Sequence, residues 1–223
     1  MSAPHHQGRL RPFRPDDDRS GDQDYDQSYS PEGFWGRRGA GCLFVARDTG
    51  HILFPLRSSQ VQNGGTWGTW GGAVGRGETP SETVLREAEE ETMADLDVGR
   101  KDLVPVSVFE VPDTFSYYNF LALVPHEFEP DLKSESNWET DDYAWVSFGN
   151  WPSPLHPGVR LLLEDPASLR IIRRHAHPAR ARRAVAGARA NSRGSRLDRE
   201  VDRMYAVLAT RSLRRARRPA RRR

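Results

Sequence analysis

Four glutamates stand at spacings that could hold a divalent cation against a phosphate group. Glu87, Glu90 and Glu91 occupy positions i, i+3 and i+4, so in a helix their side chains share one face, and Glu78 precedes them. Like charges at these spacings repel by about 0.3 kcal/mol per pair, so the face gains from a cation. Mg²⁺ and Mn²⁺ prefer oxygen ligands and keep waters that can attack phosphorus. The pattern indicates metal-dependent hydrolysis.

A glycine-rich loop and a well-marked helix start must position these carboxylates. Thr79 is suited to the N-cap, Pro80 to the first helical position, and Glu82 completes a capping box. Val84 and Ala88 can then turn toward a core. The loop lets its backbone approach a ligand or turn sharply because it contains glycines at 71, 72, 75 and 77.

The stretch 72–94 resembles the Nudix box, in which Gly, five residues, Glu and seven residues precede Arg-Glu, an apolar residue, any residue and Glu-Glu. The positions in register are Gly72, Glu78, Arg86, Glu87, Ala88, Glu90 and Glu91. The Trp- and Gly-rich segment 65–72 resembles the family's lead-in strand. Met93 departs from the pattern because the family has glycine there, and methionine takes a left-handed conformation less cheaply. We therefore expect the exit of the helix to differ.

The resemblance implies a hydrolase that uses Mg²⁺ or Mn²⁺ to cleave the pyrophosphate bond of a nucleoside diphosphate linked to another moiety. It implies a catalytic group that includes Arg86, which would orient the carboxylates, together with Glu87 and Glu90. The metal ligands that it implies are a backbone carbonyl of Gly71 or Gly72 and the carboxylates of Glu78, Glu87, Glu90 and Glu91. The box does not separate nucleoside triphosphates, dinucleotides, ADP-ribose and capped RNA as substrates.

Two further side chains outside the box are candidates for the site. Similar enzymes often place another carboxylate near the metals, and we favour Glu139 as general base over its neighbours Asp141 and Asp142 and over Glu110. Arg57 could bind substrate phosphate through bidentate hydrogen bonds, although it could equally be a surface arginine. Aromatic residues that offer either base-stacking surfaces or core packing are Trp67, Trp70, Phe115, Tyr117, Tyr118 and Trp145.

The pattern between residues 37 and 165 predicts one α+β domain with a mixed β sheet and helices on its faces, and the resemblance implies the Nudix-like α/β/α sandwich. Hairpins are expected over 41–46 with 52–56 and over 103–111 with 115–124. Another strand is expected at 143–148, and helices at 155–165 and 168–175.

Both ends of the chain differ in composition from this domain. Residues 1–33 are polar with an Asp-rich run, and we expect a disordered acidic arm. Residues 166–223 form an Arg-rich, partly helical extension with an amphipathic pattern at 196–217, so the formal net charge of +2 hides a basic end. Such a tail could bind RNA or another polyanion. This leaves an alternative function, a catalytically weak Nudix-like module that binds polyanions.

The sequence contains no apolar run near the roughly 20 residues that a bilayer span requires. It also lacks a charged-then-apolar signal sequence, and Cys42 is its only cysteine. We therefore expect a cytoplasmic protein that acts on a nucleotide-type small molecule, with an oligomeric state that the sequence does not determine.

Overall fold

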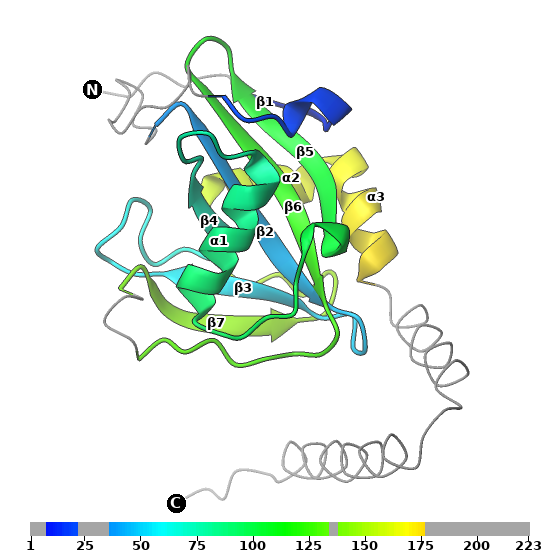
Figure 1. Ribbon diagram of the computed structural model, residues 1–223. Coiled ribbons are helices and arrows are strands. Elements are labelled where there is room, and N and C mark those ends of the chain that lie inside the picture. Colours follow the sequence, from blue (N-terminus) through cyan, green and yellow to red (C-terminus); the bar gives the residue numbers. More distant parts are fainter. Residues whose placement is uncertain (1–7, 22–35, 134–137, 177–223) are drawn as a thin grey trace, which may run out of the picture. The chain divides into compact units, whose positions relative to one another are not determined.

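The computed structural model describes residues 8–21, 36–133 and 138–176, which contain a mixed β sheet between two helical layers (Figure 1). Strand order is β1-β5-β6-β2-β3-β7, and β4 pairs with β2 off this path. The β2–β6 pair is parallel, whereas the other pairs are antiparallel. The strands are β1 (Arg9–Pro12), β2 (Arg38–Ala46), β3 (Ile52–Arg57), β4 (Trp70–Ala73), β5 (Leu103–Val111), β6 (Phe115–Val124) and β7 (Thr140–Val146).

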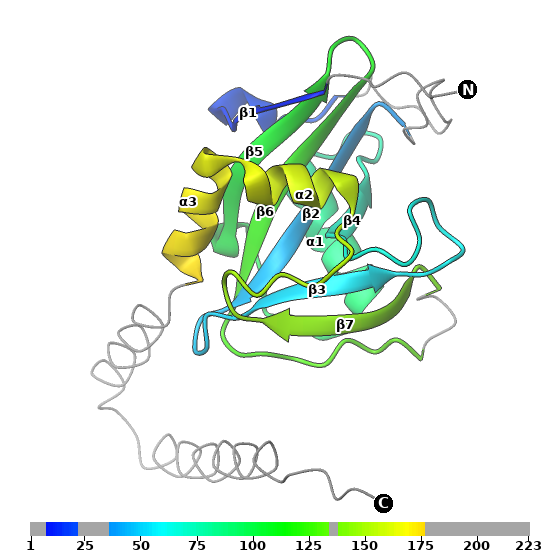
Figure 2. The same cartoon turned by 180° about the vertical axis from the view of Figure 1, so that it is seen from behind.

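Helices cover both faces of the sheet. Helix α1 (Pro80–Thr92) lies on the face seen in Figure 1, whereas α2 (Pro157–Glu164) and α3 (Pro166–His175) lie on the face seen in Figure 2. Short 3₁₀ helices are η1 (Pro15–Asp17) and η3 (Arg100–Asp102). The three layers confirm the predicted α+β class.

Side chains alternate along β2 between two buried clusters, as the period of two in a strand requires. Cys42 and Phe44 join the cluster under α1, which also contains Val84 and Ala88. Leu43 and Val45 join the opposite cluster. That second cluster includes Val159, Leu162 and Ile172 from the two C-terminal helices. The apolar pattern of the central strand therefore fixes α1 on one face and the other two helices on the other.

Most predicted elements are present, with shifted ends. Both hairpins form. Strand β7 begins at Thr140 and ends at Val146, earlier than the predicted 143–148, because its pairing with β3 starts at a bulge beside Arg57. Helix α2 begins at Pro157 with His156 as its N-cap, two residues after the predicted start.

The predicted domain boundary at 165 is too early. Asp165 is the one residue between α2 and α3, and it caps α3 by accepting a hydrogen bond from the Ser168 N–H at 2.7 Å. Ile172 of α3 is completely buried in the cluster shared with the sheet. The residues from 177 onward, including the segment predicted as an amphipathic helix, lie outside the described ranges. Within those ranges, every helix is too short or too polar to cross a bilayer.

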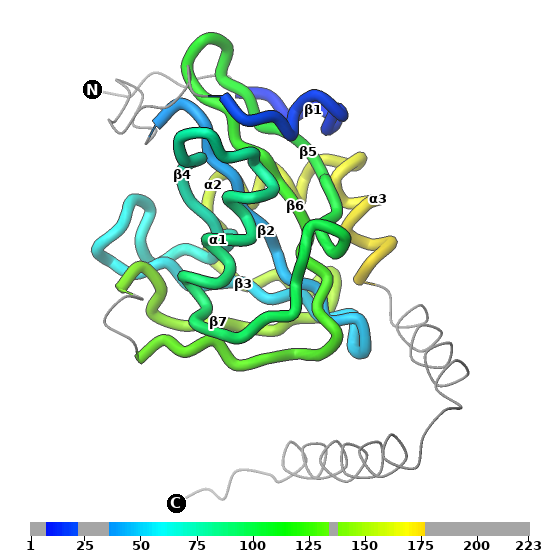
Figure 3. The backbone as a smooth tube through the Cα atoms, viewed as in Figure 1, coloured from blue at the N-terminus to red at the C-terminus, as the bar shows by residue number. Residues whose placement is uncertain are grey.

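The prediction of disorder across residues 1–33 is wrong for residues 8–21. They contain β1, which pairs with β5, and the 3₁₀ helix η1 (Figure 3). Ion pairs made by Arg11 with Asp17 and Glu110 hold this segment, and Phe13 packs on the cluster under α1. An apolar-periodicity argument misses it because charged pairs and one aromatic ring carry the contacts. The remaining residues of the predicted arm lie outside the described ranges.

Met93 ends α1 in the conformation that the resemblance assigns to glycine. Its φ and ψ are 50° and 23°, in the left-handed region, and its N–H donates to the Glu89 carbonyl at 2.9 Å. The expectation of a different helix exit is therefore wrong for the backbone, which follows the glycine-type geometry despite the side chain. For an L-residue this conformation costs about 1–2 kcal/mol.

Met93→Gly should stabilise the fold by about 0.5–1 kcal/mol, since relief of the left-handed strain outweighs the extra chain entropy of an unfolded glycine. Urea unfolding measures the change. Met93→Ala is the control, because it shortens the same exposed side chain but keeps the β-carbon, and it should not gain stability. A Met93→Gly protein no more stable than Met93→Ala would contradict this account of the helix exit.

Candidate active site

The start of α1 forms the predicted capping box. The Thr79 Oγ1 accepts a hydrogen bond from the Glu82 N–H at 3.3 Å, and a Glu82 carboxylate oxygen accepts one from the Thr79 N–H at 2.8 Å. Pro80 occupies the first helical position. The sequence therefore fixes where the helix begins, and with it which residues face the sheet and the loop 71–78.

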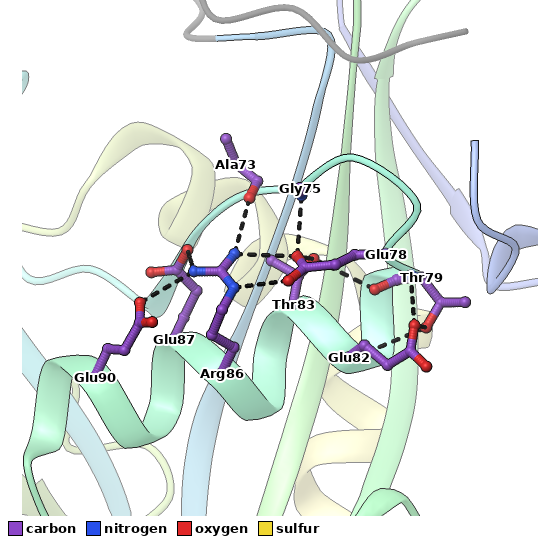
Figure 4. Close-up of polar contacts among 9 residues, drawn as sticks. All are labelled: Ala73, Gly75, Glu78, Thr79, Glu82, Thr83, Arg86, Glu87 and Glu90. Atoms are coloured by element: carbon purple, nitrogen blue, oxygen red, sulfur yellow. Dashed lines mark hydrogen bonds and ion pairs between the residues drawn. The ribbon is translucent and has the colours of Figure 1, made fainter. Parts of the chain in front are cut away.

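One guanidinium connects three of the four predicted carboxylates (Figure 4). Arg86 donates from Nε to Glu78 at 2.8 Å and from Nη2 to the other Glu78 oxygen at 3.1 Å. Its Nη1 donates to Glu87 at 2.7 Å and to Glu90 at 3.1 Å. It also reaches the carbonyl of Ala73 at 3.4 Å, so it ties the helix to the end of β4. Arg86 thus orients the carboxylates, as expected.

Glu78 anchors this arginine. Besides the two bonds from Arg86, one of its oxygens accepts from the Gly75 N–H at 3.0 Å and from the Thr83 Oγ1 at 2.8 Å. The hydrogen bonds from Arg86 lower the pKa of Glu78 to about 2, with help from Thr83 and Gly75 and against the opposing effect of partial burial. Since both carboxylate oxygens are engaged, Glu78 anchors Arg86 in this structure, and its predicted role as a metal ligand stays a prediction.

Glu87 and Glu91 lie against the glycines of β4. The Gly71 N–H donates to Glu91 at 2.8 Å. A β-carbon on Gly72 would stand 2.5 Å from a Glu87 oxygen, so only glycine permits this approach. Burial raises the pKa of Glu87 and raises that of Glu91 further. The negative charges of neighbouring glutamates also raise the pKa of each carboxylate. The result is a crowded set of negative charges beside the backbone of β4.

Glu139 and Arg57 lie beside this acidic face. The Ser58 N–H donates to the Glu139 carbonyl at 2.8 Å, which holds the start of β7 against the end of β3. The charge of Glu139 adds to the raised pKa of both Glu87 and Glu91, after burial and nearer groups. The charge of Arg57 acts on Glu91 in the opposite direction. The fold therefore brings both of these predicted residues to the candidate site.

Other acidic candidates lie elsewhere. Glu110 is held by Arg11, at 2.7 Å, in the β1–β5 pair, so its selection as a rival base is not supported. Asp141 and Asp142 are exposed on β7. Among these acidic candidates, Glu139 is therefore the one whose charge affects the pKa of Glu87 and Glu91.

The aromatic candidates are mostly packed in the core. Trp70 and Tyr118 are buried under α1, and Trp145 packs there with its Nε1 donating to the Phe128 carbonyl at 2.9 Å. Trp67 packs on the opposite cluster. Tyr117 hydrogen-bonds the Thr69 hydroxyl at 2.9 Å. Core packing is therefore the better interpretation for Trp67, Trp70, Tyr118 and Trp145.

Sequence reasoning missed His156. Burial, followed by the positive charge of Arg57, lowers the pKa of this imidazole to about 4, which favours the neutral ring. Its Nδ1 accepts the Gly158 N–H at 3.2 Å at the start of α2. Nothing in the local sequence marked this position, because Arg57 and His156 are 99 residues apart in the chain and the effect of the one on the other arises only on folding.

The carboxylates suit a hard divalent cation in chemical type. In the residues that the structure describes, no three acidic, histidine or cysteine side chains converge closely enough to hold an ion together as they stand. Arg86 draws Glu87 and Glu90 to itself, but the Glu90 side chain is 60% exposed and can rotate. Glycine at position 72 leaves room for Glu87 beside the backbone of β4. The residues therefore fit a cation at Glu87, Glu90 and Glu91.

A family model described as the NUDIX domain matches residues 35–177. The chain belongs to the Nudix family. This match extends past the predicted boundary at 165 and includes α3, in agreement with the packing of that helix.

Curated relatives of this Nudix chain include two named proteins. The protein named "Putative 8-oxo-dGTP diphosphatase 3" from Mycobacterium tuberculosis is 34% identical over 133 residues, which are 56% of this chain and 59% of that protein. A nucleoside triphosphate pyrophosphatase/Nudix hydrolase fusion protein of Bifidobacterium longum is 32% identical over 128 residues, 53% of this chain and 25% of its own length. The chain thus spans about three fifths and a quarter of these relatives.

Solved structures that are similar to this chain include RenU, a Nudix hydrolase from Mycobacterium smegmatis. It is 26% identical to this Nudix chain, and the alignment covers 66% of this chain and 91% of that one with a TM-score of 0.48.

Glu78→Gln should remove a stabilising contribution that depends on pH. The pKa of Glu78 falls from 4.5 to about 2 on folding, which corresponds to stability on the order of 3 kcal/mol. Because the folded pKa is the lower one, this stability is present above the unfolded pKa and is lost as pH falls from about 4.5 toward 2.

Urea unfolding at several pH values between 6 and 3 should show a gap between wild type and Glu78→Gln that narrows as the pH falls. The control is Glu89→Gln, since Glu89 is exposed on the same helix and has no hydrogen bond to Arg86. A gap that stays constant with pH would contradict the anchoring role of Glu78.

Proposed function

We propose that this protein hydrolyses the pyrophosphate bond of a nucleoside diphosphate linked to another moiety, with Mg²⁺ or Mn²⁺ as cofactor. The observation that carries the proposal is the arrangement of Glu87, Glu90 and Glu91 beside β4, oriented in part by Arg86. Nudix hydrolases generally use divalent metals. The names of the relatives mention nucleoside triphosphates, so these are the first substrates to test.

In this mechanism Glu87, Glu90 and Glu91 would hold the cation, and a backbone carbonyl of Gly71 or Gly72 would complete the protein's share of ligands. The bound cation would neutralise charge on the phosphoryl oxygens and lower the pKa of a water. Arg86 keeps Glu87 and Glu90 on the loop side of α1 through the bonds of 2.7 and 3.1 Å. Its own position depends on Glu78.

Glu139 is the proposed general base. Its carboxylate lies near enough to Glu87 and Glu91 to affect the pKa of both, so it borders the same space. A carboxylate oxygen of Glu139 would accept the proton of the attacking water. The oxygen of that water would form the new bond to phosphorus, and the bridging oxygen would leave with the second phosphate-bearing product.

Arg57 is the proposed phosphate contact. Its Nε donates to the Gln62 carbonyl at 3.1 Å, which leaves the Nη groups of the guanidinium for a ligand beside Glu91. A planar guanidinium suits bidentate binding of phosphate oxygens. The Arg57 guanidinium would therefore hold a substrate phosphate close to the Mg²⁺ or Mn²⁺ ion.

The polyanion-binding alternative and the cytoplasmic location stay predictions. The Arg-rich tail on which the alternative depends lies outside the described ranges beyond residue 176. The anchored carboxylates favour the enzymatic proposal.

Glu90→Gln should reduce metal-dependent turnover by about 100-fold or more, because it removes a charged ligand without changing side-chain volume. Glu89→Gln is the matched control one position earlier, and it should keep wild-type turnover. Product release is measured from nucleoside triphosphates including 8-oxo-dGTP, dinucleotides, ADP-ribose and capped RNA, with Mg²⁺, Mn²⁺ or excess chelator. Full activity of Glu90→Gln, or turnover that survives the chelator, would contradict the mechanism.

Glu139→Gln should lower kcat by about 100-fold with little change in KM, as expected for loss of a general base that does not bind the ground state. Asp141→Asn tests whether any acid on this strand matters, and it should behave as wild type. Steady-state kinetics on the best substrate separate kcat from KM. An equal loss of kcat in both variants would assign the effect to the negative charge around the start of β7 and not to a general base.

A further inference from the structure

An N-terminal strap, defined here as residues 9–18, lies outside the segment 35–177 that matches the family. Its strand β1 pairs with β5 in antiparallel register, with Arg9 opposite Glu110 and Pro12 opposite Ser107. Phe13 then packs edge-on against Phe120 at 5.1 Å between ring centroids. The strap therefore follows the sheet and reaches the face that carries α1 (Figure 3).

Ion pairs hold the strap in a defined shape. Arg11 donates to both oxygens of Asp17, each at 2.7 Å, and its Nε donates to Glu110 at 2.7 Å. Both partners of the first pair are largely buried, with 15% and 10% of their side chains exposed. Partial burial alone would raise the pKa of Asp17, but the hydrogen bonds from Arg11 and from the Arg14 N–H outweigh it and lower the pKa. The residue that follows, Asp18, is placed by this arrangement.

Asp18 joins the strap to the first turn of α1. One carboxylate oxygen accepts the Ser81 N–H at 2.9 Å, and the other accepts the Ser81 hydroxyl at 2.8 Å and the guanidinium of Arg100. Ser81 is 2% exposed, and in this structure Asp18 is the acceptor that satisfies its N–H. A negative charge at the N-terminal end of a helix also complements the helix dipole.

The contact fixes the helix from outside the family's own segment. Thr79 caps the Glu82 N–H, whereas Asp18 takes the Ser81 N–H and ties it through Arg100 to η3. Glu87 lies six residues further along, about 9 Å at 1.5 Å per residue, so a tilt of about 6° at Ser81 moves Glu87 by about 1 Å. Catalysis by positioned groups is sensitive to displacements near 1 Å.

We propose that Asp18 is a positioning residue for the reaction: through Ser81 and Arg100 it sets the angle at which α1 presents Glu87, Glu90 and Glu91. The predicted loss of kcat rests on the proposed function. The predicted loss of Mn²⁺ affinity can be measured without turnover.

The experiment compares full-length wild type with Asp18→Ala, Asp18→Asn and Ser81→Ala. Asp18→Ala should lower kcat about tenfold and weaken Mn²⁺ binding several-fold, with nucleotide KM within about twofold of wild type. Asp18→Asn should recover part of both losses because its amide oxygen can still accept the Ser81 N–H. Asp16→Ala is the control, since Asp16 is an exposed acid of the same strap that pairs with Arg19.

A double variant, Asp18→Ala with Ser81→Ala, tests whether the effect passes through α1. It should lose little more than Asp18→Ala alone, because the hydroxyl bond that Ser81→Ala removes is already lost when Asp18 is replaced. Additive losses would overturn the proposed route.

Mn²⁺ affinity, measured by electron paramagnetic resonance, separates this inference from the proposed function. An inactive wild type would reject the proposed function, yet the affinities of the variants would still test the strap. Folded Asp18→Ala and Ser81→Ala proteins with wild-type Mn²⁺ affinity and wild-type kcat would overturn the positioning role. Ser81→Ala keeps every charge of the strap, so it supplies the answer if Asp18→Ala does not fold.

Discussion

The bonds of the Arg86 guanidinium to Glu78, Glu87 and Glu90 are the interactions on which the candidate site depends. They join the loop before α1 to the acidic face of the helix itself. A lysine could not make these contacts, because its ammonium is a single point and not a planar group with five donors. Removal of Glu78 would free the arginine, so the conformation of the loop and the orientation of the carboxylates are coupled.

The scaffold brings like charges together and compensates them only in part. Glu91 accepts a hydrogen bond from the Gly71 N–H, and Glu87 shares Arg86 with two other acids. Burial and mutual repulsion raise the pKa of both groups. An acidic cluster of this kind loses stability unless a cation joins it, which is the property that a cation-dependent enzyme requires.

Three kinds of contact hold α1 in place: its own cap, its packing on the sheet and the bond from the strap. Its own Thr79 and Glu82 cap the first turn, and Val84 and Ala88 bury its inner face against the sheet. The strap adds Asp18 from a segment far away in sequence. Met93 ends α1 in a left-handed backbone conformation, which is strained for a residue with a β-carbon. The contacts that hold the helix must offset this strain energy.

The sequence by itself determined the start of α1, the glycine-rich loop, the two hairpins and the identity of the box residues. Each of these depends on local rules: a capping box, glycine without a β-carbon, and alternation in strands. Only the tertiary structure decided that Glu78 anchors Arg86, that Glu139 and Arg57 lie beside Glu91, and that the strap is ordered. These outcomes depend on contacts between residues distant in sequence, and no local pattern encodes them.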